Sequence, residues 1–204
     1  MAAPILKVEQ LTKQYTRGLL NKQVTFSLAA DFTVDKPQVI GVMGPNGSGK
    51  TTLFELITGS NLPTSGRVLV NGQDIHQVRT RERDRLAIHY HQSYQVRSFQ
   101  RNKPNFMLEH AAASSPAVHL FDEPQFNTQD GYIGFMLDFF RKLRSNGRLV
   151  FLCLHPNERY HVDILRECCE RFIFVEKGVV TQAPGFDALL QDPRVRDYLG
   201  ALVS

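Results

Sequence analysis

The sequence lacks the features of a membrane-spanning or secreted protein. Its 204 residues contain no run of about eighteen consecutive apolar residues, which excludes a transmembrane helix from our expectations. The first residues, Met1-Ala2-Ala3-Pro4, have neither the basic stretch nor the apolar core of a signal peptide. Three cysteines, Cys153, Cys168 and Cys169, fit no disulfide framework and no metal-ligand spacing. We therefore expect a protein of the reducing cytoplasm.

Repeats, low-complexity linkers and a large charge of one sign are also absent. The net charge of +4 and the isoelectric point near 9.0 would suit contact with nucleic acid or an anionic membrane, but many inert surfaces carry a similar charge. We therefore do not expect nucleic acid as a partner. The hydrophobic content of 42% and the charged content of 22% are those of an ordinary globular domain. The length predicts a single domain spanning residues 1–204.

One octapeptide carries most of the functional information. It is Gly44-Pro45-Asn46-Gly47-Ser48-Gly49-Lys50-Thr51, which fills the Gly-x-x-x-x-Gly-Lys-Ser/Thr template of a phosphate-binding loop. The apolar run 38–43 before it predicts a buried parallel strand, and residues 50–58 after it predict a helix. This arrangement directs backbone N–H groups and a helix N-terminus at an anion. Lys50 would contact the β- and γ-phosphates, and the Thr51 hydroxyl would bind Mg²⁺. The octapeptide predicts a site for a nucleoside triphosphate.

The remaining pattern predicts an α/β fold with a mostly parallel sheet. Strands and helices largely alternate after residue 38, which is typical of parallel sheets flanked by helices. The expected strands are 67–70, which runs into a hairpin turn at Asn71-Gly72, and 87–90, 117–121, 149–154 and 172–175. The expected helices are 104–113, 130–143 and 162–169. Three earlier strands, 5–8, 24–28 and 32–34, predict a small antiparallel β layer within about residues 1–37.

A second motif could complete the triphosphate site. The strand that ends at Asp122-Glu123-Pro124 would deliver Asp122 to the metal and Glu123 as the general base that orients water. Taken alone, this tripeptide would be a solvated turn, but it follows a phosphate loop. His155, at the end of the strand 149–154, could reach a γ-phosphate, or it could be a structural histidine. Gln92 follows the strand 87–90, where its carboxamide could touch both Mg²⁺ and water.

Together these motifs resemble an ATP-binding cassette (ABC) ATPase. The resemblance rests on residues 44–52, on Ser65-Gly66-Arg67-Val68-Leu69-Val70-Asn71-Gly72, on Asp-Glu-Pro, on the strand closed by His155, and on the tail 192–200. It implies ATP and Mg²⁺ as ligands and extends the nucleotide-binding loop to Thr52. It also implies a RecA-like P-loop core over residues 38–204. Tyr15 matches the aromatic residue that stacks on adenine in the family, although a strand-end tyrosine would look the same.

The sequence departs from the family pattern in its middle. The family carries a helical subdomain and a Leu-Ser-Gly-Gly-Gln signature between the positions that match Gln92 and Asp122, but these residues are only thirty positions apart here. The signature pentapeptide does not occur, and the matching region, Ser98 to Asn102, preserves almost none of it. We therefore expect a truncated helical region near residues 93–113. In the family, the signature holds the γ-phosphate of the partner's ATP, so this chain keeps only the half of the site that acts in cis.

The resemblance implies a subunit that couples ATP-driven dimer closure to a membrane permease. The expected setting is cytoplasmic, with attachment to the membrane through a partner. A second ABC ATPase subunit completes the site in the family. Because a homodimer of this chain would lack both signatures, we favour a heterodimer with a signature-bearing cassette. The alternative is a degenerate cassette that binds ATP, hydrolyses little, and regulates or scaffolds a complex.

Overall fold

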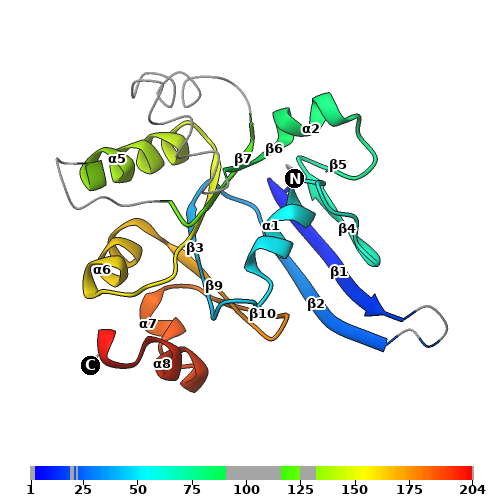
Figure 1. Cartoon of the computed structure of the whole chain (residues 1–204). Coiled ribbons are helices and arrows are strands. Elements are labelled where there is room, and N and C mark those ends of the chain that lie inside the picture. The colour runs from blue at the N-terminus through cyan, green and yellow to red at the C-terminus, as the bar shows by residue number, and fades with distance from the viewer. Residues whose placement is uncertain (1–2, 19–20, 22, 91–115, 125–131, 204) are drawn as a thin grey trace.

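The computed structural model describes residues 3–18, 21, 23–90, 116–124 and 132–203 (Figure 1). The strands are β1 Leu6–Arg17, β2 Gln23–Val34, β3 Val39–Met43, β4 Ser65–Val70, β5 Gln73–Asp74, β6 Ala87–Tyr90, β7 Val118–Asp122, β8 Leu149–Cys153, β9 Arg171–Glu176 and β10 Val179–Ala183. The helices are α1 Lys50–Ile57, α2 Thr80–Leu86, α5 Tyr132–Ser145, α6 Arg159–Cys168, α7 Phe186–Leu189, α8 Pro193–Leu199 and the 3₁₀ turn η1 Gly200–Leu202.

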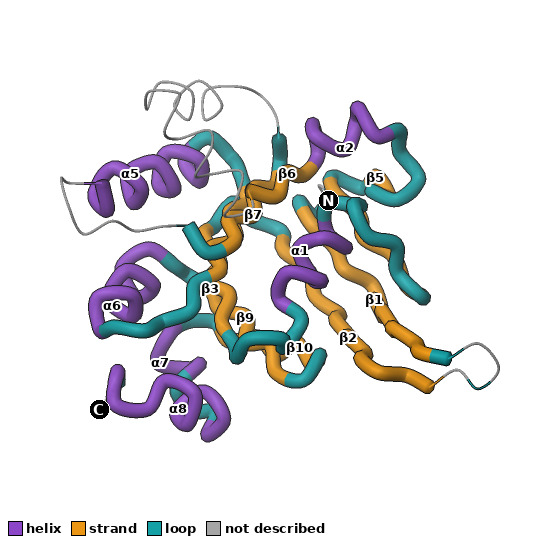
Figure 2. The backbone as a smooth tube through the Cα atoms, viewed as in Figure 1, coloured by secondary structure: helices purple, strands orange, loops and turns teal. Residues whose placement is uncertain are grey.

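Within these residues the strands form a single mixed sheet in the order β5-β4-β1-β2-β10-β9-β3-β8-β7-β6. The run from β9 to β6 is parallel throughout. The N-terminal strands are antiparallel to one another, and Figure 2 shows β1 and β2 as a long two-stranded ribbon. The predicted fold class, α/β with a parallel core and antiparallel N-terminal strands, is confirmed.

The antiparallel strands differ in detail from the prediction. They are continuous with the parallel strands through the pair Val179 and Ala29, which joins β10 to β2. They also take in β4 and β5, whose hairpin turn falls at Asn71-Gly72 as expected. Residues 32–34 were predicted as a separate strand, but they are the end of β2. The strand continues because its side chains still alternate between the core and solvent through Asp31, which is exposed.

The described residues form two hydrophobic cores on opposite faces of the sheet. Ile40 and Val42 of β3 pack in the core that contains α1 and the N-terminal strands. Val39 and Met43 pack in the core that contains α5, α6, α7 and α8. Figure 1 shows α1 on one side of β3 and α5 and α6 on the other. Successive residues of a strand point to opposite faces, so a strand covered on both faces is apolar throughout, as the sequence of β3 is.

The helices agree with the predictions in part. The segments predicted at 130–143 and 162–169 form α5 and α6 within a few residues of the expected bounds. Helix α2 was not predicted, because its alternating charges indicated only a solvated segment. Its sole buried residue is Leu86. The helix predicted at 104–113 lies outside the described residues. None of the described helices combines the length and the apolar character needed to cross a membrane.

Candidate functional site

The sheet order brings the predicted site residues to neighbouring strand ends. Strand β8 lies between β3 and β7, and all three are parallel. Lys50 and Thr51 follow β3, His155 follows β8, and Glu123 follows β7, whose last residue is Asp122. The carboxyl ends of parallel strands share one edge of the sheet, where ligands bind in α/β folds. The topology therefore collects residues from three separate parts of the sequence.

The loop between β3 and α1 has the backbone that its glycines permit. Gly44 has a φ of +148°, and a Cβ atom there would lie 2.0 Å from the carbonyl oxygen of Val175. Gly49, with a φ of +110°, immediately precedes α1, and a Cβ there would lie 2.8 Å from the ring of Phe26. A side chain would clash at both positions, so glycine is required for this close packing.

Two polar side chains of the loop, Ser48 and Lys50, are buried. The ammonium group of Lys50 donates to the carbonyl oxygens of Gly44 and Pro45, at 2.7 and 2.9 Å. An ammonium group has three donors, and these two carbonyls take two of them. The Ser48 hydroxyl is buried and has no hydrogen-bond partner among the described residues. A buried polar group without a partner costs free energy. A ligand held by the loop would remove this cost by forming a hydrogen bond with the Ser48 hydroxyl.

Asp122 is tied to the phosphate loop. Its Oδ2 accepts a hydrogen bond from the Thr51 hydroxyl at 3.0 Å, and His89 Nε2 lies 3.2 Å from the same oxygen. Burial alone would raise the pKa of Asp122, but the hydrogen bonds from His89, Thr51 and Cys153 outweigh it and lower the pKa. The carboxylate is therefore ionised at neutral pH, as a carboxylate ligand of a divalent cation is, and it contacts the first turn of α1 through Thr51.

Glu123 has an unusual backbone conformation. Its φ is +50°, in the left-handed region that residues other than glycine rarely adopt. Its N–H donates to the carbonyl oxygen of Cys153 at 3.0 Å, which extends the pairing of β7 with β8 by one residue. The Glu123 side chain lines the same cleft as the phosphate loop. Strained backbone of this kind is common at functional positions.

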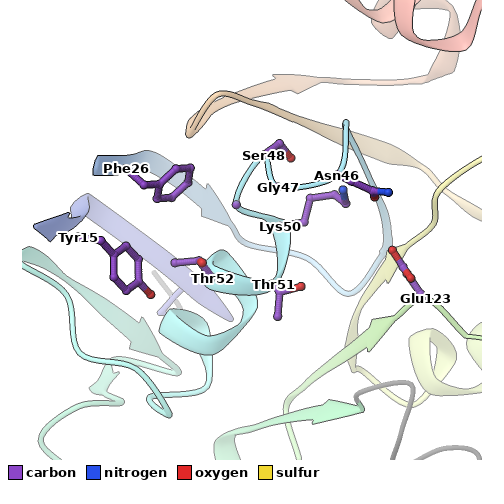
Figure 3. A pocket seen from close by; sticks show the side chains of 10 residues that line it. Tyr15, Phe26, Asn46, Gly47, Ser48, Lys50, Thr51, Thr52 and Glu123 are labelled. Atoms are coloured by element: carbon purple, nitrogen blue, oxygen red, sulfur yellow. The ribbon is translucent and has the colours of Figure 1, made fainter. Parts of the chain in front are cut away.

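A cleft of about 350 Å³ connects these groups to an aromatic pair (Figure 3). Tyr15 and Phe26 lie on one side of the phosphate loop, and Glu123 lies on the other. The two aromatic rings are 6.2 Å apart. The described residues that line the cleft are Tyr15, Phe26, Asn46, Gly47, Ser48, Gly49, Lys50, Thr51, Thr52 and Glu123.

Phe26 was not predicted as a site residue. The period-two pattern of residues 24–28 predicted its strand, but the pattern does not reveal that the ring packs against Gly49. Tyr15, which was predicted, also accepts a hydrogen bond from the Asn61 side chain at 2.8 Å. The Lys13 ammonium lies 5.1 Å from the centre of the Tyr15 ring. These contacts fix the ring of Tyr15 beside the cleft.

Other predicted residues either do not line the cleft or lie beyond the described part of the chain. Gly44 and Pro45 form the base of the loop, and neither lines the cleft. His155 does not line it either, and its Nδ1 lies 2.9 Å from the hydroxyl of Tyr198 in α8. Gln92 and the region from Ser98 to Asn102 lie outside the described residues, so their predicted roles stay predictions.

A comparison with protein families agrees with this site. The family model described as "ABC transporter" matches residues 29–127, which include the phosphate loop and Asp122-Glu123. This chain contains an ABC transporter ATP-binding cassette domain. Its phosphate loop and its Asp-Glu pair thus belong to one family pattern, and they lie at one edge of one sheet.

Solved cassettes have the same fold. The chain is similar to the "ATP binding subunit of ABC transporter" with a TM-score of 0.70 and 17% identity, covering 98% of this chain and 100% of that one. It is also similar to a bacterial Atm1-family ABC exporter with ATP bound, with a TM-score of 0.71 and 16% identity, covering 98% of this chain and 42% of the exporter. At identities this low, the similarity shows the fold alone.

Curated relatives match a shorter stretch. The methionine import ATP-binding protein MetN 2 of Rhodococcus jostii is 43% identical over 72 residues, covering 35% of this chain and 21% of that protein. The lipoprotein-releasing system ATP-binding protein LolD of Coxiella burnetii is 36% identical over 84 residues, covering 41% of this chain and 35% of that protein. The chain therefore spans about a fifth to a third of the length of these relatives.

Proposed function

We propose that this cassette binds ATP with Mg²⁺ and hydrolyses it as a subunit of an ABC transporter, coupling dimer closure to a membrane permease. The observation that carries the proposal is the hydrogen bond between Thr51 and Asp122. A hydroxyl of the phosphate-loop helix donates to a carboxylate from another strand at 3.0 Å, and Glu123 follows in the same cleft. A loop that only bound phosphate would not require this second strand end.

Each residue of the cleft has a defined part in this proposal. The loop N–H groups and Lys50 bind the β- and γ-phosphates, and the buried Ser48 hydroxyl gains a partner there. Bound Mg²⁺, held by Thr51 and Asp122, would supply positive charge that offsets the charge of the phosphates. Glu123 accepts a proton from the attacking water and orients it.

Four further residues complete the proposed site. Tyr15 and Phe26 offer an aromatic surface for adenine at the far side of the loop. We propose Gln92 as a further group that touches the metal and the water. His155 donates to the γ-phosphate after the cleft closes.

We propose a heterodimer, because the sequence supplies only the half of the site that acts in cis. No Leu-Ser-Gly-Gly-Gln pentapeptide occurs in it, so a second cassette has to supply donors to the γ-phosphate. Two relatives, the methionine import protein MetN 2 and the lipoprotein-releasing system protein LolD, support a transport role for this cassette. The missing signature equally favours the second candidate, a regulatory cassette that stays bound to ATP.

The test is Mg²⁺-dependent ATP turnover, measured for the chain alone and with a cassette that carries an intact signature. We expect ATP binding by the chain alone, negligible turnover alone, and turnover in the mixture. The control is Glu123→Gln, which keeps the side-chain shape and should bind ATP but abolish the turnover that depends on this site.

Each outcome separates the candidates. Turnover by the chain alone at the rate of the mixture would show that no signature partner is needed. ATP binding without turnover in either sample would favour the regulatory cassette. Failure to bind ATP, as measured by calorimetry against a Lys50→Ala control, would refute both.

A further inference from the structure

The C-terminal helix α8 contacts His155 directly. Tyr198, near the end of α8, places its hydroxyl 2.9 Å from His155 Nδ1. The two rings are 5.9 Å apart, and the Tyr198 ring also packs against Phe174 of β9 at 5.7 Å. Helix α8 is anchored independently by Val195 and Leu199, which are buried. The hydroxyl of Tyr198 can therefore be removed without removing what holds the helix.

A second hydrogen bond determines which atom donates the proton. The backbone N–H of Gly44, the first residue of the phosphate loop, donates to the Tyr198 hydroxyl oxygen. Because an N–H group can only donate, the hydroxyl oxygen is the acceptor in this bond. The single hydroxyl proton is then available to His155 Nδ1. If Nδ1 donated instead, the phenol O–H would have no partner at this position, which would cost free energy.

The phenol keeps its proton in this environment. Burial raises the pKa of Tyr198 most, and Cys153 and Glu123 raise it further. The Gly44 N–H lowers the pKa, but by less than burial raises it. The group that faces Nδ1 at neutral pH is therefore a neutral hydroxyl with one proton to donate.

We propose that Tyr198 is a positioning residue that holds His155 in the tautomer with its proton on Nε2. A neutral imidazole has one N–H donor and one acceptor, so a nitrogen that accepts at Nδ1 leaves the N–H at Nε2. In this tautomer Nε2 can donate to a γ-phosphate, whereas the other tautomer would present a lone pair to an anion. The role of His155 at the γ-phosphate rests on the proposed function, whereas the assignment of its tautomer does not.

The bond between Tyr198 and Gly44 extends this role to the phosphate loop. One hydroxyl joins the first residue of the loop to the histidine that follows β8. The two strand ends are adjacent, because β3 and β8 are paired. Tyr198 therefore sets the orientation of His155 relative to the loop, as well as its tautomer.

The first test reads the tautomer by NMR of the ¹⁵N-labelled ring nitrogens, without nucleotide and at about pH 8, where imidazoles are mostly neutral. His155→Ala identifies the His155 signals. We expect the Nε2–H tautomer in the wild-type chain and a shift of roughly fivefold toward Nδ1–H in Tyr198→Phe, which is the change in ratio that about 1 kcal/mol produces. An Nδ1–H tautomer in the wild-type chain, or an unchanged ratio in Tyr198→Phe, overturns the proposal.

The chain offers a matched control. Tyr90 makes the same kind of contact with His119, its hydroxyl lying 3.1 Å from Nδ1. Tyr90→Phe should change the ring signals of His119 and leave those of His155 as they are. A change at His155 in Tyr90→Phe would mean that the signals report general loosening of the fold, and it would count against the proposal.

The second test measures turnover with the signature-bearing cassette. We expect Tyr198→Phe to lower kcat by up to about fivefold, which is the limit that the shift in tautomer ratio sets, and to change the KM for ATP less than twofold, because the lost interaction acts after ATP has bound. Unchanged kcat beside a shifted tautomer overturns the positioning role. Absence of ATP binding by the wild-type chain would refute the proposed function, while the tautomer result would stand or fall separately.

Discussion

The conformation of Glu123 predicts that its replacement by glycine stabilises the protein while it abolishes hydrolysis. The φ of Glu123 is +50°, and the next residue is Pro124, which pushes the residue before it toward extended conformations. A left-handed conformation costs an L-residue about 1–2 kcal/mol, and glycine does not have this cost. Glycine loses about 0.5–1 kcal/mol more backbone entropy on folding. The expected net gain is about 0.5–1 kcal/mol in the free energy of unfolding.

The assay is equilibrium unfolding in urea without nucleotide, so that ligand binding does not contribute to stability. For a chain of this length the gain corresponds to a rise of about 1–4 °C in the midpoint of thermal unfolding. Glu123→Gln is the comparison, since it keeps the backbone conformation and should change stability by less than about 0.5 kcal/mol. Both variants should lose the turnover that depends on Glu123.

Lys177 provides the matched control. It has a φ of +48° in the turn between β9 and β10, and it does not line the cleft. Lys177→Gly should give a similar gain in stability and retain turnover. If Glu123→Gly is no more stable than Glu123→Gln, the left-handed conformation stores no strain and the reasoning is wrong.

Two further predictions concern histidines outside the sequence motifs. Burial lowers the pKa of His76, so the folded protein binds fewer protons than the unfolded chain below about pH 6.5, and stability should fall as the pH drops. His76→Asn should lessen the stability difference between about pH 7.5 and 5.5 in urea unfolding, and an unchanged difference would exclude His76 as its source. His89→Phe removes the hydrogen bond to Asp122, and we expect Mg²⁺ affinity in the presence of ATP to weaken about 10–100-fold by calorimetry. Binding of ATP without Mg²⁺ is the control, and equal weakening there would show general damage to the site.

The parts of the fold that local sequence determines could be predicted. The strand, loop and helix around Lys50 occupy consecutive residues, and the glycines that the loop needs are visible in the sequence. Strand β2 is a part of the fold that its local sequence does not predict. Ala29, Ala30 and Asp31 are poor strand formers, so the sequence indicated a break, but pairing with β1 carries the strand through them. Asp31 is tolerated because its side chain is exposed and accepts a hydrogen bond from the Gln10 N–H.

The residues that the sequence did not reveal have a common property. Phe26, His89 and Tyr198 each contact a motif residue from a distant part of the chain, and none of the three was predicted as a site residue. Phe26 packs on Gly49, His89 contacts Asp122, and Tyr198 contacts His155. A motif describes the groups that would touch ATP, whereas these contacts depend on the register of the sheet and on the position of α8 against it.

The motif residues and the residues that contact them should respond differently to mutation. Replacing Lys50 or Glu123 removes a group that the proposed reaction uses directly, so activity should be lost outright. Tyr198 acts on a proton of His155, so its loss should leave the imidazole in place with the wrong nitrogen protonated. Tyr198→Phe should therefore retain part of the activity that His155→Ala loses, and the double variant should be no worse than His155→Ala. A double variant with a further loss would show that Tyr198 acts through some group other than His155.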